Sequence, residues 1–510
     1  MVRLTPTQSS VFFRILFTVC VFCAQGELGF AGPPVSNPYE AALADASDLP
    51  PDPVDVPTVT NAELMARLQQ TEDKLKQLQQ EREPEGGLLT AMQDRWGQVR
   101  DPSITTVDQQ THGASKTDSK KKWYDRLSIR GYAQFRHNTT LYQSDGSAPA
   151  QHVGDRSVGE DQNFLIRRAR LILSGDVSDR MYVYIQPDFA SSPPGSPDAN
   201  QFAQIRDWYA DLYMDDEKVH RVRMGQSKVP FGWENLQSSS NRLPLDRSDS
   251  TNSAVRNERD LGVFYYWTPE KAQDLFKEVL DEGLKGSGNY GVFGIGVHNG
   301  QGGSFIEQND NLHVVSRLAY PFKLPSGQIF EVGAQGYVGK YTVLSSVIQP
   351  LGAGAASRPA GTLETGNRAG LTDQRVAGTM IWYPQPLGFQ AEWNVGTSPG
   401  LNDAQTAVVD RSLSGGYAMV MYRHETVRCG TLFPFARYNH FRGGYKAERN
   451  APFSRIDEWE AGLEWQFNPQ MELVTMYTIT DRTNTVARSS GLSYGQFDGH
   501  LLRAQFQINY

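Results

Sequence analysis

The feature that most constrains this 510-residue chain is a series of sixteen segments in which apolar and polar residues alternate. Alternation with a period of two is typical of β-strands that have one apolar face. The segments begin near Leu127, Asn163, Met181, Phe202, Val219, Arg259, Asn289, His313, Ile329, Asp373, Leu387, Gly415, Thr431, Ile456, Gln470 and Asp498. The pattern predicts an all-β fold.

The links between these segments are alternately short and long. Tight turns are expected at 177–180, 215–218, 384–386 and 468–469, and long polar loops at 139–162, 229–258 and 341–372. Short turns at one end and long loops at the other are typical of an outer-membrane barrel, with the turns in the periplasm. The sequence therefore predicts a 16-stranded antiparallel transmembrane β-barrel over residues 123–510, with both barrel termini in the periplasm.

The composition fits such a barrel, although it first suggests a soluble protein. Only 39% of the residues are hydrophobic and the mean hydropathy is −0.49. A transmembrane strand is apolar only at alternate positions, so each segment gives a weak hydropathy signal. The chain is also rich in glycine (47), tyrosine (22) and phenylalanine (24), which suits tight turns and aromatic girdles.

The N-terminus reads as a secretory signal over residues 1–31. Arg3 and Arg14 precede the apolar run 15–24, which is too short to span a membrane and is followed by small residues. Two of the three cysteines lie in this segment. Its removal would leave Cys429 alone, which excludes an intramolecular disulfide and a thiolate metal site.

The next region contains a helical segment between two linkers. Residues 32–60 and 84–122 are expected to be linkers, the first rich in Pro, Ala and Asp and disordered. Residues 61–83 form about three heptads, with the seam at Leu64, Leu68, Thr71, Leu75 and Leu78. This spacing predicts a short α-helical coiled coil, which needs partner chains. The alternative is a single amphipathic helix that lies on another surface.

Two motifs frame the loop at 229–258. Residues 221–232 read RVRMGQSKVPFG, and residues 259–263 read RDLGV. This pair resembles the phosphate-selective porins O and P of bacterial outer membranes, as does RRARL at 167–171. The resemblance implies that the loop folds into a sixteen-stranded barrel and narrows its pore, and that the protein is a homotrimer. The alternative is a strand and a surface loop of another β-protein.

Parity along the strands predicts which charged residues face the pore. A charge on the lipid face costs about 2–4 kcal/mol near the midplane, so charged strand residues should point inward. The inward arginines are then Arg130, Arg136, Arg168, Arg170, Arg221, Arg223, Arg317 and Arg375. Lys228 matches the family's motif lysine, but its parity differs from that of Arg223, which leaves its direction open unless the strand bulges. Arg242 and Arg247, on the loop, complete the anion-binding candidates.

Acidic residues argue against strong anion selectivity. Parity also places five carboxylates in the lumen, at Asp207, Asp211, Glu458, Glu460 and Glu464. From Leu127 onward there are 36 lysines and arginines against 40 aspartates and glutamates, a net charge of −4. The arginines could therefore bind anions in sequence, or pair with these acids across the lumen and set the shape of the pore.

The link at 269–284 does not fit the alternation of links. It has a helical period, at Ala272, Leu275, Phe276, Val279 and Leu280, where a short turn is expected. Either a helix packs under the barrel at this point, or the strand count is wrong here.

The sequence as a whole predicts an outer-membrane porin that passively conducts small anions such as phosphate or polyphosphate. The alternatives are a general non-selective porin and a barrel that tethers the membrane to the cell wall through the coiled coil. The expected partners are outer-membrane lipid, small anions, two further copies of the chain and the cell wall, but no nucleic acid. The nine histidines show no nucleophile motif or metal spacing, so neither catalysis nor a cofactor or metal is expected.

Overall fold

The computed structural model describes residues 123–510 except for 149, 151, 154, 156, 159–162, 191–202, 304, 346–347, 351–368, 427–428 and 489–490. The predicted signal segment, both linkers and the coiled coil therefore lie outside the described residues. The described part begins with a short 3₁₀ turn, η2 (Trp123–Arg126), that leads directly into the first strand.

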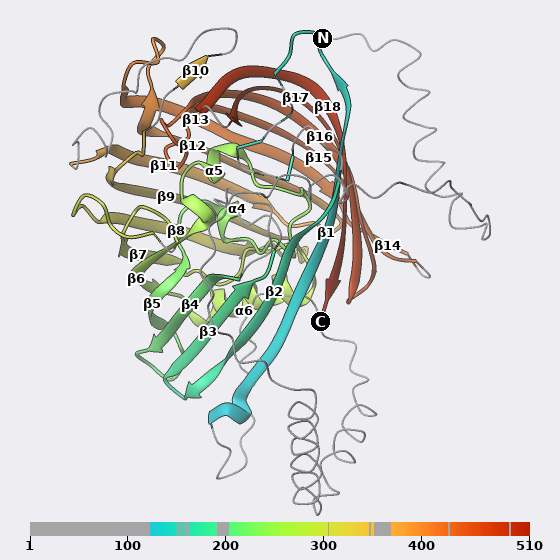
Figure 1. Ribbon diagram of the computed structural model, residues 1–510. Coiled ribbons are helices and arrows are strands. Elements are labelled where there is room, and N and C mark those ends of the chain that lie inside the picture. Colours follow the sequence, from blue (N-terminus) through green and yellow to red (C-terminus); the bar gives the residue numbers. More distant parts are fainter. Residues whose placement is uncertain are drawn as a thin grey trace, which may run out of the picture. The chain divides into compact units, whose positions relative to one another are not determined.

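Sixteen antiparallel strands form a closed barrel, because β1 pairs with both β2 and β18 (Figure 1). The barrel strands are β1 (Leu127–Gln143), β2 (Asn163–Ser178), β3 (Met181–Asp188), β4 (Gln204–Tyr213), β5 (His220–Lys228), β6 (Arg259–Trp267), β7 (Phe293–His298), β8 (His313–Lys323), β9 (Ile329–Tyr341), β11 (Leu371–Trp382), β12 (Leu387–Leu401), β13 (Val408–Tyr422), β15 (Gly430–Gly444), β16 (Phe453–Asn468), β17 (Met471–Arg488) and β18 (Gly491–Asn509). The predicted barrel is confirmed.

Each predicted segment corresponds to one barrel strand, and the largest differences in starting residue are at β13 and β18. These strands begin at Val408 and Gly491, each seven residues before the predicted start. Their early residues are mostly polar or small and give no apolar alternation. Two short strands were not predicted: β10 (Ile348–Pro350), which pairs in parallel with β18, and β14 (His424–Thr426), which pairs with β15.

Side chains alternate between an apolar outer face and a polar lumen. Ile129 and Phe164 are 70% and 86% exposed on the outside, whereas Arg136 and Arg223 are almost fully buried inside. These four residues lie as parity predicts, whereas adjacent residues are both buried at Arg167–Arg168 and at Arg206–Asp207. The two-residue links 179–180 and 469–470 lie at the same end of the barrel, which we call the turn end.

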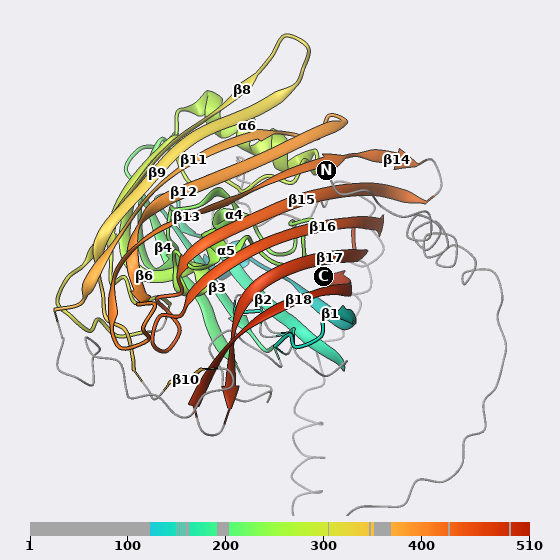
Figure 2. The same ribbon diagram turned by 90° about the horizontal axis from the view of Figure 1, so that it is seen from above.

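The connection from β5 to β6, residues 229–258, lies within the ring of strands, and we call it the inner loop (Figure 2). Its apolar side chains dock on the inner wall: Val229 and Phe231 pack with Phe264, while Leu243 and Leu245 belong to a separate cluster on the β13–β17 wall. No helix was predicted here, but the loop contains three short helical turns, α4 (Trp233–Leu236), α5 (Asp249–Asn252) and η3 (Arg256–Glu258).

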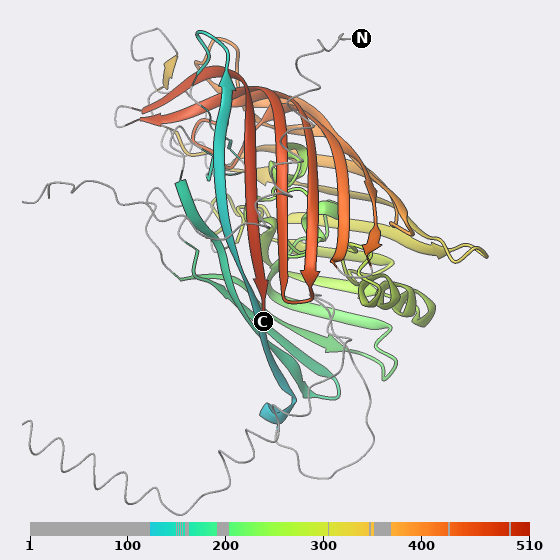
Figure 3. The ribbon, with the colours of Figure 1, turned by 90° about the vertical axis from the view of Figure 1, so that its right-hand side faces the viewer.

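The predicted helix between β6 and β7 is confirmed as α6 (Glu270–Asp281), and the strand count holds on either side of it. It lies at the turn end (Figure 3). Ala272 and Phe276 cluster with Val292 and partly buried Tyr320, which fixes the helix against the wall at β8. Within the described part of the chain, no helix has the length and apolar character needed to cross a membrane.

Candidate functional site

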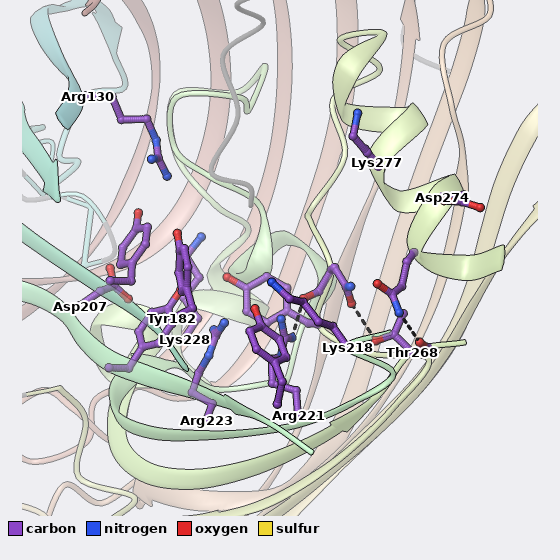
Figure 4. A pocket seen from close by; sticks show the side chains of 16 residues that line it. Arg130, Tyr182, Asp207, Lys218, Arg221, Arg223, Lys228, Thr268, Asp274 and Lys277 are labelled. Carbon is purple, nitrogen blue, oxygen red and sulfur yellow. Dashed lines mark hydrogen bonds between the residues drawn. The ribbon is translucent and has the colours of Figure 1, made fainter. Parts of the chain in front are cut away.

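A cavity of about 210 Å³ opens in the lumen near the turn end, between the wall formed by β1 and β3–β5 and the β6–β7 connection (Figure 4). We call it the turn-end cavity. Six cationic side chains line it, at Arg130, Lys218, Arg221, Arg223, Lys228 and Lys277. Five tyrosines also line it, at Tyr182, Tyr184, Tyr209, Tyr213 and Tyr290. Only two carboxylates do so, Asp207 and Asp274. Cations therefore outnumber carboxylates among the side chains that line the cavity.

Two arginines of β5 share one carboxylate on the neighbouring strand. Arg223 donates from Nε and Nη2 to the two oxygens of Asp211, at 2.7 and 2.9 Å. Its guanidinium also lies 3.8 Å from the ring centroid of Tyr209. Arg221 approaches Asp211 at 3.5 Å and donates to the carbonyl of Asn289 at 2.8 Å. Asp211 therefore offsets part of the charge of two guanidiniums.

Two other cations lie nearer the turns. Arg130, on β1, donates to Ser174 Oγ at 2.7 Å, and its guanidinium lies 5.9 Å from the centroid of the Tyr184 ring. Lys218 follows β4 in a tight turn, 4.6 Å from the ring centroid of Tyr213. Burial lowers the pKa of Lys218, while Asp176 at 3.6 Å raises it. Both cations are therefore held over aromatic rings.

Lys228 does point into the lumen. Its Nζ donates to the carbonyls of Leu236 and Gln237 in the inner loop, at 2.9 and 3.2 Å. The regular alternation of β5 is lost at Gly225, which has a φ of +123°, and the residues from Gln226 to Lys228 are all buried. Glycine is needed there, because a Cβ would lie 2.3 Å from the carbonyl oxygen of Trp208. The backbone at Gly225 thus settles the direction that parity had left open.

The other five predicted residues do not line the turn-end cavity, and three of them pair with acids. Arg170 binds Asp188 at 2.8 Å, Arg247 binds Glu258 at 2.6 Å, and Arg317 binds Glu331 at 2.9 Å. Arg168 donates to Gln134 Oε1 at 2.7 Å, and Arg242 donates to the carbonyl of Pro244 at 3.2 Å. Burial lowers the pKa of Arg242, and Glu234 and Asp246 oppose that shift. The structure thus gathers four of the nine candidates: Arg130, Arg221, Arg223 and Lys228.

All five predicted lumenal acids are buried, and each has a cationic partner. The pairs are Asp207 with Arg259, Asp211 with Arg223, Glu458 with Arg482, Glu460 with Arg437, and Glu464 with Lys285. Much of the lumen therefore has the paired arrangement that the sequence offered as the alternative to an arginine column. The turn-end cavity differs because its cations outnumber its acids.

Sequence reasoning missed the tyrosines, Lys218 and Lys277. Parity would have found Tyr182 and Tyr184, which alternate with Val183 and Ile185 along β3, but it was applied only to charged residues. Lys277 lies on α6, whose position inside the turn end could not be read from a helical period. Among the described residues, no group of three or more histidine, cysteine, aspartate or glutamate side chains is arranged to hold a metal ion.

Comparison with known families identifies this barrel. The family model of the phosphate-selective porins O and P matches residues 144–510, which is more than half of the chain. The chain belongs to this family. It is therefore an outer-membrane porin, and the resemblance inferred from the loop motifs is confirmed.

Several solved outer-membrane channels resemble the porin more distantly. The OmpT trimer of Vibrio cholerae has a TM-score of 0.42 and 10% identity, and the match covers 76% of this chain and 100% of OmpT. OmpF of Salmonella typhi in complex with daunomycin has a TM-score of 0.46 and 13% identity, covering 77% and 99%. The channel DcaP of Acinetobacter baumannii has a TM-score of 0.44 and 13% identity, covering 75% and 97%. A search of curated protein sequences found no match.

Proposed function

We propose that this porin passively conducts small anions, phosphate or polyphosphate among them, through the turn-end cavity. The observation that carries this proposal is the excess of six cationic side chains over two carboxylates along the cavity. A cleft lined by one sign of charge concentrates ions of the opposite sign. Guanidinium groups can each bind two oxygens of a phosphate, so the same residues suit oxyanions in particular.

Conduction also requires that no single site holds the ion too tightly. Asp211 offsets the charge of Arg223 through two hydrogen bonds, and Asp207 is bound by Arg259 at 2.9 Å. The first contact weakens the hold of Arg223 on a passing anion, and the second reduces repulsion of the anion by Asp207. Lys228 then places an ammonium group at the point where β5 gives way to the inner loop, which would set the constriction.

Reversing cavity charges tests the proposal. The double variant Arg130→Glu with Lys218→Glu removes two cations and adds two anions without touching the Arg223–Asp211 pair. We expect the anion-to-cation permeability ratio, measured from reversal potentials in planar bilayers, to fall by about threefold or more, since a change of one kT in local potential alters ion concentration about e-fold.

The matched control is Arg126→Glu with Arg180→Glu. These two cations lie at the same end of the barrel but do not line the cavity, and their partners Asp179 and Asp216 are exposed. The control should keep the wild-type ratio. An unchanged ratio in the cavity variant, or an equal change in both variants, would remove these residues from the selectivity mechanism.

A general, weakly selective porin is the second candidate, and the paired charges favour it. Buried pairs such as Arg317–Glu331 and Arg482–Glu458 place opposite charges along the wall. Such pairs give a field across the pore with little net preference for either sign. A wild-type permeability ratio near one would favour this candidate over the anion channel.

We further propose that residues 61–83 form a periplasmic coiled coil at the base of a homotrimer and contact the cell wall. The heptad seam from Leu64 to Leu78 supports this part of the proposal. Deleting residues 32–122 would then weaken the trimer and reduce the amount of protein that co-sediments with peptidoglycan, without changing single-channel conductance. Unchanged trimer stability and co-sedimentation would contradict it.

A further inference from the structure

The connection between β6 and β7, residues 268–292, is unusually long for the turn end. Its neighbours at that end include the two-residue turns 179–180 and 469–470. The connection first forms α6 and then returns to the wall through residues 283–292, which we call the crossbar. Neither the family's loop motif nor the proposed anion site explains why this segment exists.

The crossbar is tied on one side to β16. Lys285 Nζ forms an ion pair with Glu464, and both side chains are at most 1% exposed. Lys285 adopts a positive φ of +64°, a conformation that a non-glycine residue rarely takes. A strained backbone conformation persists only where the surrounding contacts hold it in place. The buried ion pair is such a contact, so it fixes the position of this segment.

The opposite side of the crossbar is tied to β5. Arg221 Nη2 donates to the carbonyl of Asn289 at 2.8 Å, and Thr268 Oγ1 donates to Asn289 Oδ1 at 2.9 Å. β5 and β16 are separated by eight strands in one direction around the barrel and by six in the other. Residues 283–292 therefore cross the lumen from one wall to the other.

The inner loop braces the middle of the crossbar. Gln237 Nε2 donates to the carbonyl of Lys285 at 2.6 Å, and Asn241 Nδ2 donates to the carbonyl of Gly286 at 2.9 Å. The two inward-folded segments thus form one hydrogen-bonded unit, because amide side chains of the inner loop bind backbone oxygens of the crossbar.

Apolar packing fills the space on the far side of this unit. Trp233 of the inner loop and Leu284 of the crossbar cluster with Ile329, Ile381 and Tyr383 of the wall, together with Val279 of α6. The cluster lies at β9 and β11, whereas the turn-end cavity lies at β1 and β3–β5. Apolar side chains therefore fill the lumen beside β9 and β11, on the side away from the turn-end cavity.

We propose that the crossbar is a second constriction element, which confines permeating ions to the turn-end cavity, and that Tyr290 and Asn289 form the inner wall of their path. Both residues line the cavity, and Lys277 on α6 extends the same wall (Figure 4). The inference takes the cavity as the conduction path of the proposed function, but it does not depend on the sign of the ion.

Cysteine labelling tests the proposal with little risk to folding. The variant is Tyr290→Cys in a Cys429→Ser background, because Cys429 is exposed and would also react. The control is Ser326→Cys in the same background, an exposed position in the β8–β9 turn at the same end of the barrel. A bulky charged methanethiosulfonate reagent is added to single channels, and mass spectrometry counts the labelled thiols.

We expect the reagent to reduce the conductance of the Tyr290→Cys channel by at least about half, since Tyr290 would line a narrow path, and to leave the Ser326→Cys channel unchanged. Labelling at Tyr290→Cys without loss of conductance would overturn the proposal. Failure of the reagent to reach this cysteine would overturn it too.

A second variant tests the brace. Glu464→Gln removes the charge that pairs with Lys285, so the single-channel conductance should rise or fluctuate between levels. The double swap Lys285→Glu with Glu464→Lys should restore the wild-type conductance. Lys323→Gln is the control, because it breaks an exposed pair between β8 and Glu278 of α6. Wild-type conductance in the Glu464→Gln channel would contradict a bracing role.

The two proposals fail separately. Block by labelling at Tyr290→Cys in a channel without anion preference would refute anion selectivity and leave the crossbar standing. Anion preference without block would refute the crossbar proposal and leave anion selectivity standing.

Discussion

Two regions of the same lumen use arginine in different ways. At the inner loop, guanidiniums are matched by carboxylates: Arg437 pairs with Glu234 and Glu460, and Arg482 pairs with Glu458 and Asp249. In the turn-end cavity, six cations and two carboxylates line the surface. Tyrosine rings lie beside several of these cations, in addition to acidic partners such as Asp211 and Asp176. We call the first region the paired region.

An inward arginine therefore has no fixed role in this barrel. In the paired region, Arg437 and Arg482 each bind one acid of the inner loop and one acid of β16. Removal of either arginine would leave buried carboxylates uncompensated. In the turn-end cavity, aromatic rings hold cations while leaving them net positive, as with Lys218 over Tyr213. In the proposed account, the first arrangement sets the shape of the pore and the second sets the charge along the ion path.

Substitutions in the paired region should cause the largest loss of stability. Arg437→Met leaves Glu234 and Glu460 buried without their cation, and we expect a loss of about 3–5 kcal/mol in the free energy of unfolding. Urea unfolding in lipid vesicles, followed by tryptophan fluorescence, measures it. Arg455→Met is the control, since Arg455 is exposed and its pair with Asp457 should contribute less than about 1 kcal/mol. Equal stabilities for the two variants would refute the distinction.

Lys446, in the loop between β15 and β16, forms a further buried ion pair with Asp373 of β11, and its titration gives the free energy of unfolding a pH dependence. Burial lowers its pKa from 10.5 to about 8, although Asp373 opposes the shift. Between pH 8 and 10.5 the native state has released this proton while the unfolded state still binds it. The free energy of unfolding should therefore rise with pH across this window, by up to about 3 kcal/mol.

The check is a comparison of wild type with Lys446→Met, with urea midpoints measured at several pH values between 7 and 10.5, a window taken from the two pKa values. The wild type should gain stability through this window relative to the variant. Parallel pH profiles for the two proteins would show that Lys446 is not the titrating group.

The turn-end cavity should be sensitive at Gly225, where the change in backbone direction brings Lys228 into the lumen. Gly225→Ala places a Cβ against the Trp208 carbonyl at a positive φ, and we expect a cost of about 1–3 kcal/mol. Gly378→Ala, on β11, is the control because nothing lies within 4 Å of its Cβ. A Gly225→Ala porin that keeps wild-type stability and ion preference would show that the strand tolerates a side chain there.

The barrel could be predicted because the patterns that specify it involve residues close together in the sequence. Alternation along each strand and the lengths of the links define sixteen strands, and the cost of charge in lipid assigns Arg223 and Asp211 to the lumen. The helix at 270–281 was visible for the same reason. Each of these inferences needs only residues that are near one another in the chain.

The pairing of charges could not be predicted, because it joins distant segments. Glu234 and Arg437 meet across the lumen, as do Lys285 and Glu464, and no periodicity relates them. Parity placed eight arginines and five acids in the lumen, but it could not say that Arg317 would be matched by Glu331 while Arg130 would line a cavity. The path of the crossbar depends on the same long-range contacts.

The most direct test of the anion-channel account is the reversal potential of the purified porin in a planar bilayer under a KCl gradient, with phosphate then titrated in. The account predicts a reversal potential displaced toward the chloride equilibrium potential. It also predicts that the chloride current falls as phosphate occupies the turn-end cavity. A cation-selective or unselective potential that phosphate does not change would contradict it.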